Sequence, residues 1–327
     1  MLSDTILKNQ LKHTLDKTNF NIGKKYEGKA RDNYILNGKR IIITTDRISA
    51  FDRVLCSIPF KGQVLNQTSA FWFEKTKNIF KNHVVDVPDP KGMIVKECTP
   101  YPVEMVVRGY ITGVTTTSAW YNYERGVRNF CGNILPEGLK KNQKFGNPII
   151  TPSTKAEKGA HDESVSRDEI LKRGLVDEKM YNKMEKSALA LFDFGSKLVA
   201  KNNLILVDTK YEFGNLDGQL VLIDEIHTPD SSRFWIKDSY KELFSKGQEP
   251  QKLDKEYVRQ FLANKGFIGE GTIPSIPDEI KVEAAKRYIT AYEMITGKEF
   301  EAKNGDVLKR IEGSLKKFIN ILMNREK

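Results

Sequence analysis

Residues 204–213 alternate with the two-residue period of a β-strand, and the two faces of this strand differ in chemistry. One face carries residues typical of a protein core, namely Ile205, Val207, Thr209, Tyr211 and Phe213. The other face begins with two leucines and then becomes ionic with Asp208, Lys210 and Glu212. The pattern predicts a strand that is buried on one face and gathers charges on the other.

Residues 215–218 have the composition of a turn, and residues 219–224 are predicted to be the returning strand of a hairpin. Asp224 would add a fourth charge at the same end of the sheet. If the turn held only two residues, Glu212 would face Ile223, and Asp224 would point to the opposite side. A metal shared by Glu212 and Asp224 needs an odd loop or a bulge, and we predict that parity.

Several charges on one strand face allow two interpretations. Cross-strand salt bridges on a solvent-facing strand would each contribute about 0.2–1 kcal/mol. Alternatively, the charges bind a divalent cation, because Mg²⁺ takes one or two carboxylates and fills its other positions with water and phosphate oxygens. Burying charges without partners is costly, so a buried cluster would indicate that something binds there.

Hydrophobic periodicity predicts further elements along the chain. The predicted helices are a short amphipathic one within residues 1–20 and longer ones at 64–80, 176–202, 252–265, 277–296 and from Asp306 onward. The predicted strands are residues 31–36, 40–45, 84–87, 93–97 and 103–107. The first part of the chain, residues 20–107, is therefore a β-rich lobe.

The composition is that of an ordinary water-soluble protein, with 327 residues, 39% hydrophobic and 29% charged. No apolar run approaches the roughly 20 residues needed to cross a bilayer, and the charged N-terminus is no signal peptide. The three cysteines, Cys56, Cys98 and Cys131, are widely spaced, which fits a reducing cytoplasm and argues against a zinc site. We expect a cytoplasmic protein with no membrane partner.

The formal net charge of +10 raises the question of nucleic-acid binding. Basic and acidic residues are interleaved, as in residues 281–299, and such interleaving is typical of solvated helix faces. A basic site for a polyanionic small substrate explains the charge equally well. An RNA-binding protein would instead need one continuous positive face with exposed aromatic residues. We expect no nucleic-acid partner.

Residues 23–29 match the phosphate-loop pattern GxxxxGK, but the context differs from that of a phosphate loop. Ala30 stands where a Ser or Thr would hold the metal, and a strand follows instead of a helix. A Gly-containing hairpin with a basic residue can still lie over phosphates, as in kinases. A kinase is thus an alternative, although Asp193-Phe194-Gly195 falls within a predicted helix. We predict a hairpin that covers a nucleotide.

Two hydroxyl-rich segments are candidates for anion binding. Residues 115–118 precede a predicted helix, so they are N-cap candidates, and with Arg108 they would also suit a phosphate cradle. Residues 227–233 combine hydroxyls with Arg233. The polar loop at residues 150–163 is long enough to be typical of a functional or disordered loop.

Taken together, several blocks of the sequence resemble the SAICAR synthetase family. The blocks are residues 26–32, 45–52, 102–113, 151–163, 206–214 and 230–233, in family order. The resemblance implies an α+β fold. It also implies a β-rich nucleotide-binding lobe at residues 1–110, a central substrate and metal lobe at 111–245, and a C-terminal helical segment at 246–327 that packs on the rest.

The resemblance implies an ATP-dependent ligase of purine biosynthesis that requires Mg²⁺. Such an enzyme joins carboxyaminoimidazole ribonucleotide to L-aspartate and releases SAICAR, ADP and phosphate, through a phosphorylated carboxylate. A carboxylate oxygen is a poor leaving group, and phosphorylation converts it into a good one. The site therefore needs metal ligands and cations around the transferring phosphate.

The resemblance also implies roles for individual residues. ATP would be bound by Gly28, Lys29, Arg31 and, at its ribose, Glu104. Mg²⁺ would be held by Glu212 and Asp224, with Lys210 and Asp208 as catalytic residues. The substrates would be held by Ser49, Asp52, Arg108, Ser118, Lys155, Ser232 and Arg233.

The sequence departs from the family pattern at Val114, where the family usually has a Ser that helps to hold the ribonucleotide phosphate. The hydroxyl run that ends at Ser118 resembles a local insertion that supplies this ligand a few residues later. The sequence leaves open which hydroxyl of residues 115–118 does so. It also leaves open the oligomeric state and the order of phosphorylation and aspartate binding.

Overall fold

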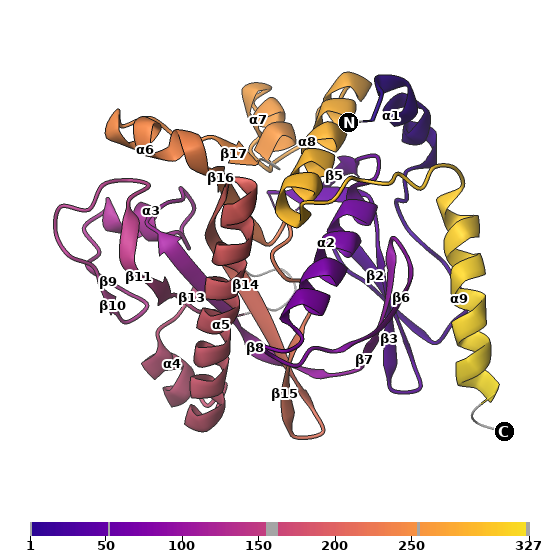
Figure 1. The fold of residues 1–327 in the computed structure, drawn as a ribbon, viewed down its shortest axis with the longest axis horizontal. Helices are drawn as coiled ribbons and strands as arrows, with labels where there is room; N and C mark the ends of the chain where they lie inside the picture. The colour runs from indigo at the N-terminus through magenta and orange to yellow at the C-terminus, as the bar shows by residue number, and fades with distance from the viewer. Residues whose placement is uncertain (1, 52, 155–162, 254–255, 325–327) are drawn as a thin grey trace. The chain divides into compact units, whose positions relative to one another are not determined.

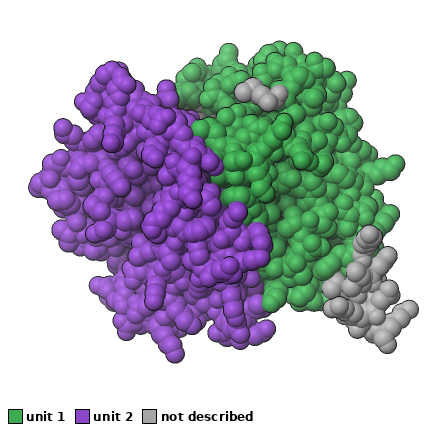
Figure 2. Space-filling model, viewed as in Figure 1, with its two compact units in different colours: residues 1–71, 83–97, 254–327 green, residues 72–82, 98–253 purple. Residues whose placement is uncertain are grey.

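The structure is a computed structural model that describes residues 2–51, 53–154, 163–253 and 256–324 (Figure 1). The chain forms two compact units (Figure 2). Unit 1 comprises residues 1–71, 83–97 and 254–327, and unit 2 comprises residues 72–82 and 98–253. Within the described ranges, no helix has the length and apolar character needed to cross a membrane.

Unit 1 is built on an antiparallel sheet of order β1-β2-β3-β7-β6 and a separate β4–β5 hairpin. Its strands are β1 (Lys24–Glu27), β2 (Arg31–Leu36), β3 (Lys39–Thr44), β4 (Arg47–Ala50), β5 (Arg53–Ser57), β6 (Val84–Asp89) and β7 (Gly92–Lys96). Its helices are α1 (Asp4–Gln10), the 3-10 turn Leu11–His13, the first part of α2 (Lys61–Thr76), α7 (Glu256–Asn264), α8 (Asp278–Thr296) and α9 (Val307–Asn324).

Helix α9 covers one face of the unit 1 sheet (Figure 1). Tyr34, Ile41 and Ile94 from the sheet share one buried cluster with Ile311 and Leu315 of α9. The apolar residues that repeat every three to four positions in α9 therefore bury a sheet face that would otherwise meet water. The helices predicted in this C-terminal segment are confirmed.

Unit 2 is built on an eight-stranded sheet that contains the path β13-β12-β8-β14-β16-β17, with β11 paired to β8 and β15 paired to β14. Its strands are β8 (Thr99–Tyr110), β9 (Asn129–Phe130), β10 (Asn133–Ile134), β11 (Lys144–Ile150), β12 (Ser153–Thr154), β13 (Glu163–Ser164), β14 (Leu204–Leu216), β15 (Gln219–Ile223), β16 (Ser232–Ile236) and β17 (Lys252–Leu253). Its helices are α3 (Ala119–Tyr123), α4 (Arg167–Lys172), α5 (Glu178–Val199), the 3-10 turn Ala200–Asn202 and α6 (Lys237–Ser245).

These units group the chain differently from the lobes expected at residues 1–110, 111–245 and 246–327. Strand β8 belongs to unit 2 because it pairs with β14 over most of its length. Residues 254–327 belong to unit 1 because α8 and α9 complete its two hydrophobic clusters. Contacts between residues far apart in the chain decide both assignments: strand pairing for β8 and hydrophobic packing for α8 and α9. A lobe-by-lobe division of the sequence does not consider such contacts.

The apolar face predicted for β14 is confirmed for Thr209, Tyr211 and Phe213, which are buried. A register shift between Leu206 and Asp208 interrupts the predicted alternation, and Ile205 and Val207 pack instead with Tyr110 and Trp235. Helix α5 packs against β14 and β8. The Tyr211 hydroxyl hydrogen-bonds to Nε2 of His227 over 2.6 Å, and burial lowers the pKa of His227 to about 3. His227 is therefore neutral and packs edge-on against Trp72.

Gly195 of α5 faces this imidazole, and the motif Asp193-Phe194-Gly195 lies within the helix, as predicted. A Cβ atom at Gly195 would lie 2.4 Å from Cε1 and 2.8 Å from Nδ1 of His227. Real Cβ atoms do not approach other atoms so closely, so the glycine is required by packing. Kinase chemistry has no support from this motif.

We predict that Gly195→Ala lowers the free energy of unfolding by about 1–3 kcal/mol, because overpacking outweighs the gain of about 1 kcal/mol in helix propensity. The matched control is Gly313→Ala in α9, where an added Cβ meets nothing within 4 Å. Gly313→Ala should stabilise the protein slightly. Urea unfolding of both variants checks this, and equal effects would contradict the packing role of Gly195.

Candidate active site

The ionic face of β14 lies beside a second charged strand, β8. In the antiparallel register Asp208 is opposite Arg108, and Glu212 is opposite Glu104. Because side chains directly opposite one another project to the same face, these four charges and Lys210 lie on one side of the sheet. The predicted ionic face is confirmed, but its charged partner is β8 instead of the hairpin strand β15.

Lys210 lies between two carboxylates, and we call Lys210 with Glu104, Glu212 and Asp224 the Lys210 cluster. Its Nζ donates to Glu104 over 2.8 Å and to Glu212 over 3.3 Å. Both glutamates are less than 10% exposed. Burial alone would lower the pKa of Lys210, but the charges of Glu212, Glu104 and Asp224 outweigh it and raise that pKa.

The predicted parity of the β14–β15 hairpin is wrong. Leu216 pairs with Gln219, so the turn is the two residues Asp217 and Gly218, and Glu212 faces Ile223. Both turn residues have positive φ, 51° and 81°, as a type I′ turn requires. Asp-Gly is among the strongest sequence signals for this turn, and it overrides the parity that we derived from the charges.

The register therefore gives no support to a metal shared by Glu212 and Asp224. Asp224, however, comes after the last residue of β15, and its φ of 67° turns the chain away from the strand. The rule that alternate residues face opposite sides does not extend to it. The charge of Asp224 raises the pKa of Lys210, and for this reason Asp224 is counted in the Lys210 cluster.

The chemistry of the Lys210 cluster suits a hard cation such as Mg²⁺, because its carboxylates outnumber its single ammonium and offer oxygen ligands. Within the described parts of the chain, no group of three or more His, Cys, Asp or Glu side chains converges as a complete metal site. These residues therefore fit a cation that takes one or two carboxylates and completes its shell with substrate oxygens. They do not fit a closed, all-protein metal cage.

A second group, which we call the Asp208 cluster, comprises Asp208, Arg108 and Arg233. Oδ2 of Asp208 accepts from Nη1 of Arg108 over 3.2 Å and from Nη1 of Arg233 over 3.0 Å. Burial lowers the pKa of Arg108 from its ordinary value, although the Asp208 carboxylate opposes the shift. Two guanidinium groups share one carboxylate, so the cluster has an excess of positive charge.

The two arginines have different surroundings. Arg108 is almost fully buried and also donates to Oγ1 of Thr151 over 2.7 Å and to the carbonyl of Thr117 over 2.8 Å. The side chain of Arg233 is 41% exposed. Arg108 thus anchors the hydroxyl-rich loop, whereas Arg233 is accessible to a ligand.

Hydroxyl groups surround the exposed arginine. Ser118 is buried, and its Oγ lies 2.8 Å from Oγ1 of Thr115. A Cβ at Gly113 would lie 2.4 Å from Oγ of Ser118 and 2.8 Å from Nη1 of Arg233, so glycine is needed for the approach of these groups. Ser232 donates to Oγ1 of Thr209 over 2.7 Å. Ser118 thus lies beside Arg233 of the Asp208 cluster, whereas Ser232 is opposite Thr209 and its side chain is on the other face of the sheet from Asp208 and Arg233. Val114 is 64% exposed.

The remaining predicted residues lie elsewhere or outside the described chain. Gly28, Lys29 and Arg31 belong to the turn and second strand of the β1–β2 hairpin in unit 1. Ser49 is exposed on β4 of the same unit. Asp52 and Lys155, both predicted substrate ligands, lie outside the described residues.

Sequence reasoning missed two contributors to this face, Gly113 and Thr151. Thr151 and Gly113 fall within blocks that resemble the family, so their presence could have been noted. Their roles depend on contacts across strands, which no local pattern shows.

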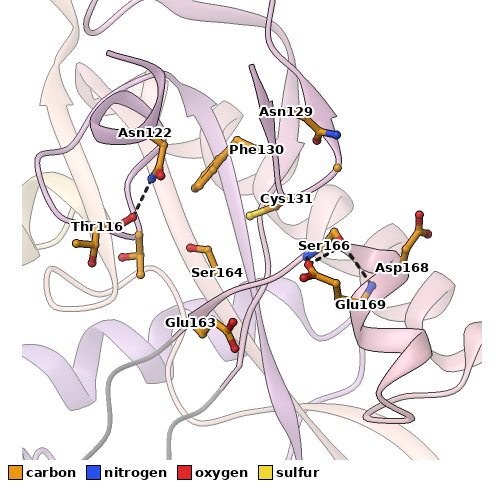
Figure 3. A pocket seen from close by; sticks show the side chains of 12 residues that line it. Thr116, Asn122, Asn129, Phe130, Cys131, Glu163, Ser164, Ser166, Asp168 and Glu169 are labelled. Carbon is orange, nitrogen blue, oxygen red and sulfur yellow. Dashed lines mark hydrogen bonds between the residues drawn. The ribbon is translucent and has the colours of Figure 1, made fainter. Parts of the chain in front are cut away.

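A cavity of about 680 Å³ lies next to the hydroxyl-rich loop in unit 2 (Figure 3). It is lined by Thr116, Thr117, Asn122, Asn129, Phe130, Cys131, Gly132, Glu163, Ser164, Ser166, Asp168 and Glu169. Thr117 joins it to the Asp208 cluster through its hydrogen bond from Arg108. Glu163 and Glu169 are already engaged, with Arg173 and with the N-cap Ser166, so the cavity by itself indicates no chemistry.

Comparison with known proteins gives a consistent result. The family described as SAICAR synthetase matches residues 24–272. A phosphoribosylaminoimidazole-succinocarboxamide synthase of Legionella pneumophila (strain Paris) is 46% identical over 309 residues, covering 93% of this chain and 98% of that protein. A chloroplastic synthase of the same name from Arabidopsis thaliana is 48% identical over 302 residues, covering 90% and 73%.

The fold agrees with these relatives. The structure of a SAICAR synthase from Saccharomyces cerevisiae, solved in complex with SAICAR, superposes with a TM-score of 0.77 at 32% identity. It covers 88% of this chain and 100% of the yeast chain. The predicted α+β class is confirmed, and the chain belongs to the SAICAR synthetase family.

Proposed function

We propose that the two charged clusters of unit 2 bind the substrates of the SAICAR synthetase reaction. The enzyme is an ATP-dependent carbon–nitrogen ligase of purine biosynthesis. It joins the carboxylate of carboxyaminoimidazole ribonucleotide to the amine of L-aspartate and forms SAICAR, ADP and phosphate. The residue roles that follow extend this activity to individual side chains.

The separation of charge along one face of β8 and β14 carries the proposal. In the Asp208 cluster two guanidinium groups bond to one carboxylate, while in the Lys210 cluster three carboxylates act on one ammonium. A phosphate is attracted to the first and a divalent cation to the second. A ligase that binds a ribonucleotide phosphate and also transfers a phosphoryl group needs both.

The chemistry begins with a carboxylate that must be activated. In the proposed path, its oxygen attacks the γ-phosphorus of ATP, and ADP leaves. The amine of L-aspartate then attacks the carboxyl carbon, phosphate leaves with that oxygen, and the nitrogen loses a proton. No covalent enzyme intermediate is needed, so catalysis rests on positioning and electrostatic stabilisation.

Lys210 supplies positive charge in this scheme and does not act as a base. Its raised pKa keeps the ammonium protonated at physiological pH. Hydrogen bonds to Glu104 and Glu212 fix its position beside the place proposed for the reacting carboxylate. A fixed charge that needs no reorganisation stabilises negative charge developing in the transition state.

Glu212 and Asp224 are the residues proposed to hold Mg²⁺. When bound, the cation would neutralise charge on the ATP phosphates. The proposal now rests on the carboxylates that act on Lys210, because the hairpin register does not support it. Glu104 remains a proposed ligand for the ATP ribose by resemblance, although its contact with Lys210 equally suits a role in orienting that ammonium.

The Asp208 cluster is proposed to hold the ribonucleotide. Arg233 and the hydroxyl of Ser118 would bind its phosphate, with Arg108 as the buried charge behind them. Ser232 stays a proposed ligand by resemblance alone, because its hydroxyl donates to Thr209 on the other face of the sheet. Among the four hydroxyls of residues 115–118, Ser118 is supported because its Oγ is the atom nearest to a Cβ built at Gly113, beside Nη1 of Arg233. Asp208 would contact the imidazole.

Unit 1 is proposed to bind ATP through Gly28, Lys29 and Arg31. Ser49, Asp52 and Lys155 are proposed substrate ligands by resemblance alone. None of the three cysteines, all of which the structure describes, forms a disulfide, which supports the expected cytoplasmic location.

A measurement of turnover tests the proposed reaction. ADP release should require ATP, carboxyaminoimidazole ribonucleotide and L-aspartate together, and Lys210→Ala or Glu212→Gln should lower kcat by roughly 10²- to 10³-fold through lost electrostatic stabilisation. Lys197→Ala, which removes an exposed lysine paired with Asp193 on α5, is the control and should leave kcat unchanged. ADP release without L-aspartate would point to a kinase instead.

The pH dependence tests the role of Lys210. Because its pKa is raised, Lys210 stays charged until the pH exceeds about 10.4, the ordinary value for lysine. Any alkaline fall in kcat below that pH must therefore come from another group. We expect this alkaline fall to persist in Lys210→Arg when kcat is measured against pH. Its disappearance in this variant would show that Lys210 itself titrates.

Removing the exposed arginine should affect one substrate selectively. Arg233→Met is expected to raise the KM for carboxyaminoimidazole ribonucleotide roughly 10- to 100-fold, the effect of losing a charged hydrogen bond. The KM for ATP should change little. Arg287→Met is a matched control, since that arginine also has a side chain 41% exposed and pairs with a carboxylate. A uniform effect of Arg233→Met on all substrates would contradict phosphate binding.

A further inference from the structure

The guanidinium of Arg47 is buried beneath the turn of the β1–β2 hairpin in unit 1, and its side chain is only 5% exposed. Nε donates to the carbonyl of Lys29 over 3.0 Å, and Nη2 donates to the carbonyl of Gly28 over 2.8 Å. Nη1 donates to the carbonyl of Asp16. One arginine thus ties two successive peptide groups of the turn to a distant segment.

Asp32 fixes the orientation of this arginine. Its carboxylate is fully buried, and Oδ1 accepts from Nη2 of Arg47 over 2.9 Å. Oδ2 accepts from the backbone N–H and the hydroxyl of Thr18 over 2.6 and 2.9 Å. With both oxygens bound, the carboxylate holds the guanidinium in one place, as a planar fork of donors allows.

The same pattern continues at the next residue of the turn. The carbonyl of Ala30 accepts from the backbone N–H of Thr45 over 2.9 Å and from its hydroxyl over 2.8 Å. Three successive carbonyls, those of residues 28–30, are therefore held from inside the unit. In a trans peptide the next N–H points opposite to the carbonyl, so the N–H groups of Lys29 and Ala30 point away from Arg47.

Adjacent N–H groups that point the same way form a concavity suited to anions, and Lys29 adds its charge on an exposed side chain. Burying a guanidinium costs free energy, and neutral donors could satisfy the same carbonyls without that cost. The cost is understandable if the turn must be held in one conformation for a ligand. The bound arginine also places a positive charge directly behind the peptide groups that face the anion.

We propose that Arg47 is a positioning residue that holds the Gly28–Ala30 turn in the conformation that receives the ATP phosphates. The inference rests on the proposed function of this hairpin. It adds a residue that touches no substrate and acts only through the backbone it holds. Lysine at this position would keep the charge but lose the fork that binds several carbonyls at once.

The test compares Arg47→Lys with wild type by hydrogen exchange of the peptide 24–36 without nucleotide, and by ATP affinity. Faster exchange and a Kd for ATP raised on the order of 10- to 100-fold are expected, as for other residues that orient ligands indirectly. The KM for L-aspartate should not change. Arg40→Lys is the control, because Arg40 forms a bidentate pair with Glu97 and lies opposite Ile35, at the end of β3 away from the Gly28–Ala30 turn.

Unchanged exchange of the peptide 24–36 in Arg47→Lys would overturn the inference. Faster exchange with an unchanged ATP Kd would also overturn it, provided that ATP protects this peptide in wild type. If wild type binds ATP without protecting the turn, the proposed ATP site fails and the inference fails with it. If Arg47→Lys does not fold, Arg47→Gln with Asp32→Asn removes both buried charges together and is held to the same outcomes.

Discussion

The Lys210 ammonium between Glu104 and Glu212 is the interaction on which the charged face of unit 2 depends. These two carboxylates lie directly opposite one another on β8 and β14, and both are largely buried. Like charges in this arrangement repel, and burial strengthens the repulsion. A single cation that bonds to both makes the register tolerable. The same register places Asp208 beside Arg108, so the two clusters are consequences of one strand pairing.

The opposite face of β8 and β14, two strands that the structure describes in full, carries no charged side chain. Tyr211 directs its hydroxyl to a neutral histidine, and α5 packs against both strands. Gly195 allows the helix to approach this imidazole closely. A rigid apolar support on one face allows a set of costly buried charges to be held in place on the other.

Buried ion pairs are weak evidence for stability, because desolvation offsets most of their attraction. Both units nevertheless bury arginines: Arg108 beside Asp208 in unit 2 and Arg47 beside Asp32 in unit 1. Each also donates to backbone carbonyls of a neighbouring loop. In both places the guanidinium fixes the conformation of a loop assigned to anion binding, which is a reason to retain a charge that an apolar core would not need.

The sequence by itself determined the local elements and the chemistry of the charged face. The alternation predicted both faces of β14 from Asp208 onward, and apolar periodicity located α5, α8 and α9. The family blocks identified the reaction. The sequence also contained the signal for the two-residue turn at Asp217-Gly218, but we predicted an odd loop from the charges instead.

The tertiary structure decided which charges meet. No local pattern indicates that β8 pairs with β14 over a hundred residues away, that Asp224 leaves its strand, or that α9 completes the first unit. Side-chain periodicity depends on neighbours along one element and is therefore written in the sequence. Strand pairing depends on the burial of whole faces and on the neutralisation of charges, which only the assembled fold satisfies together.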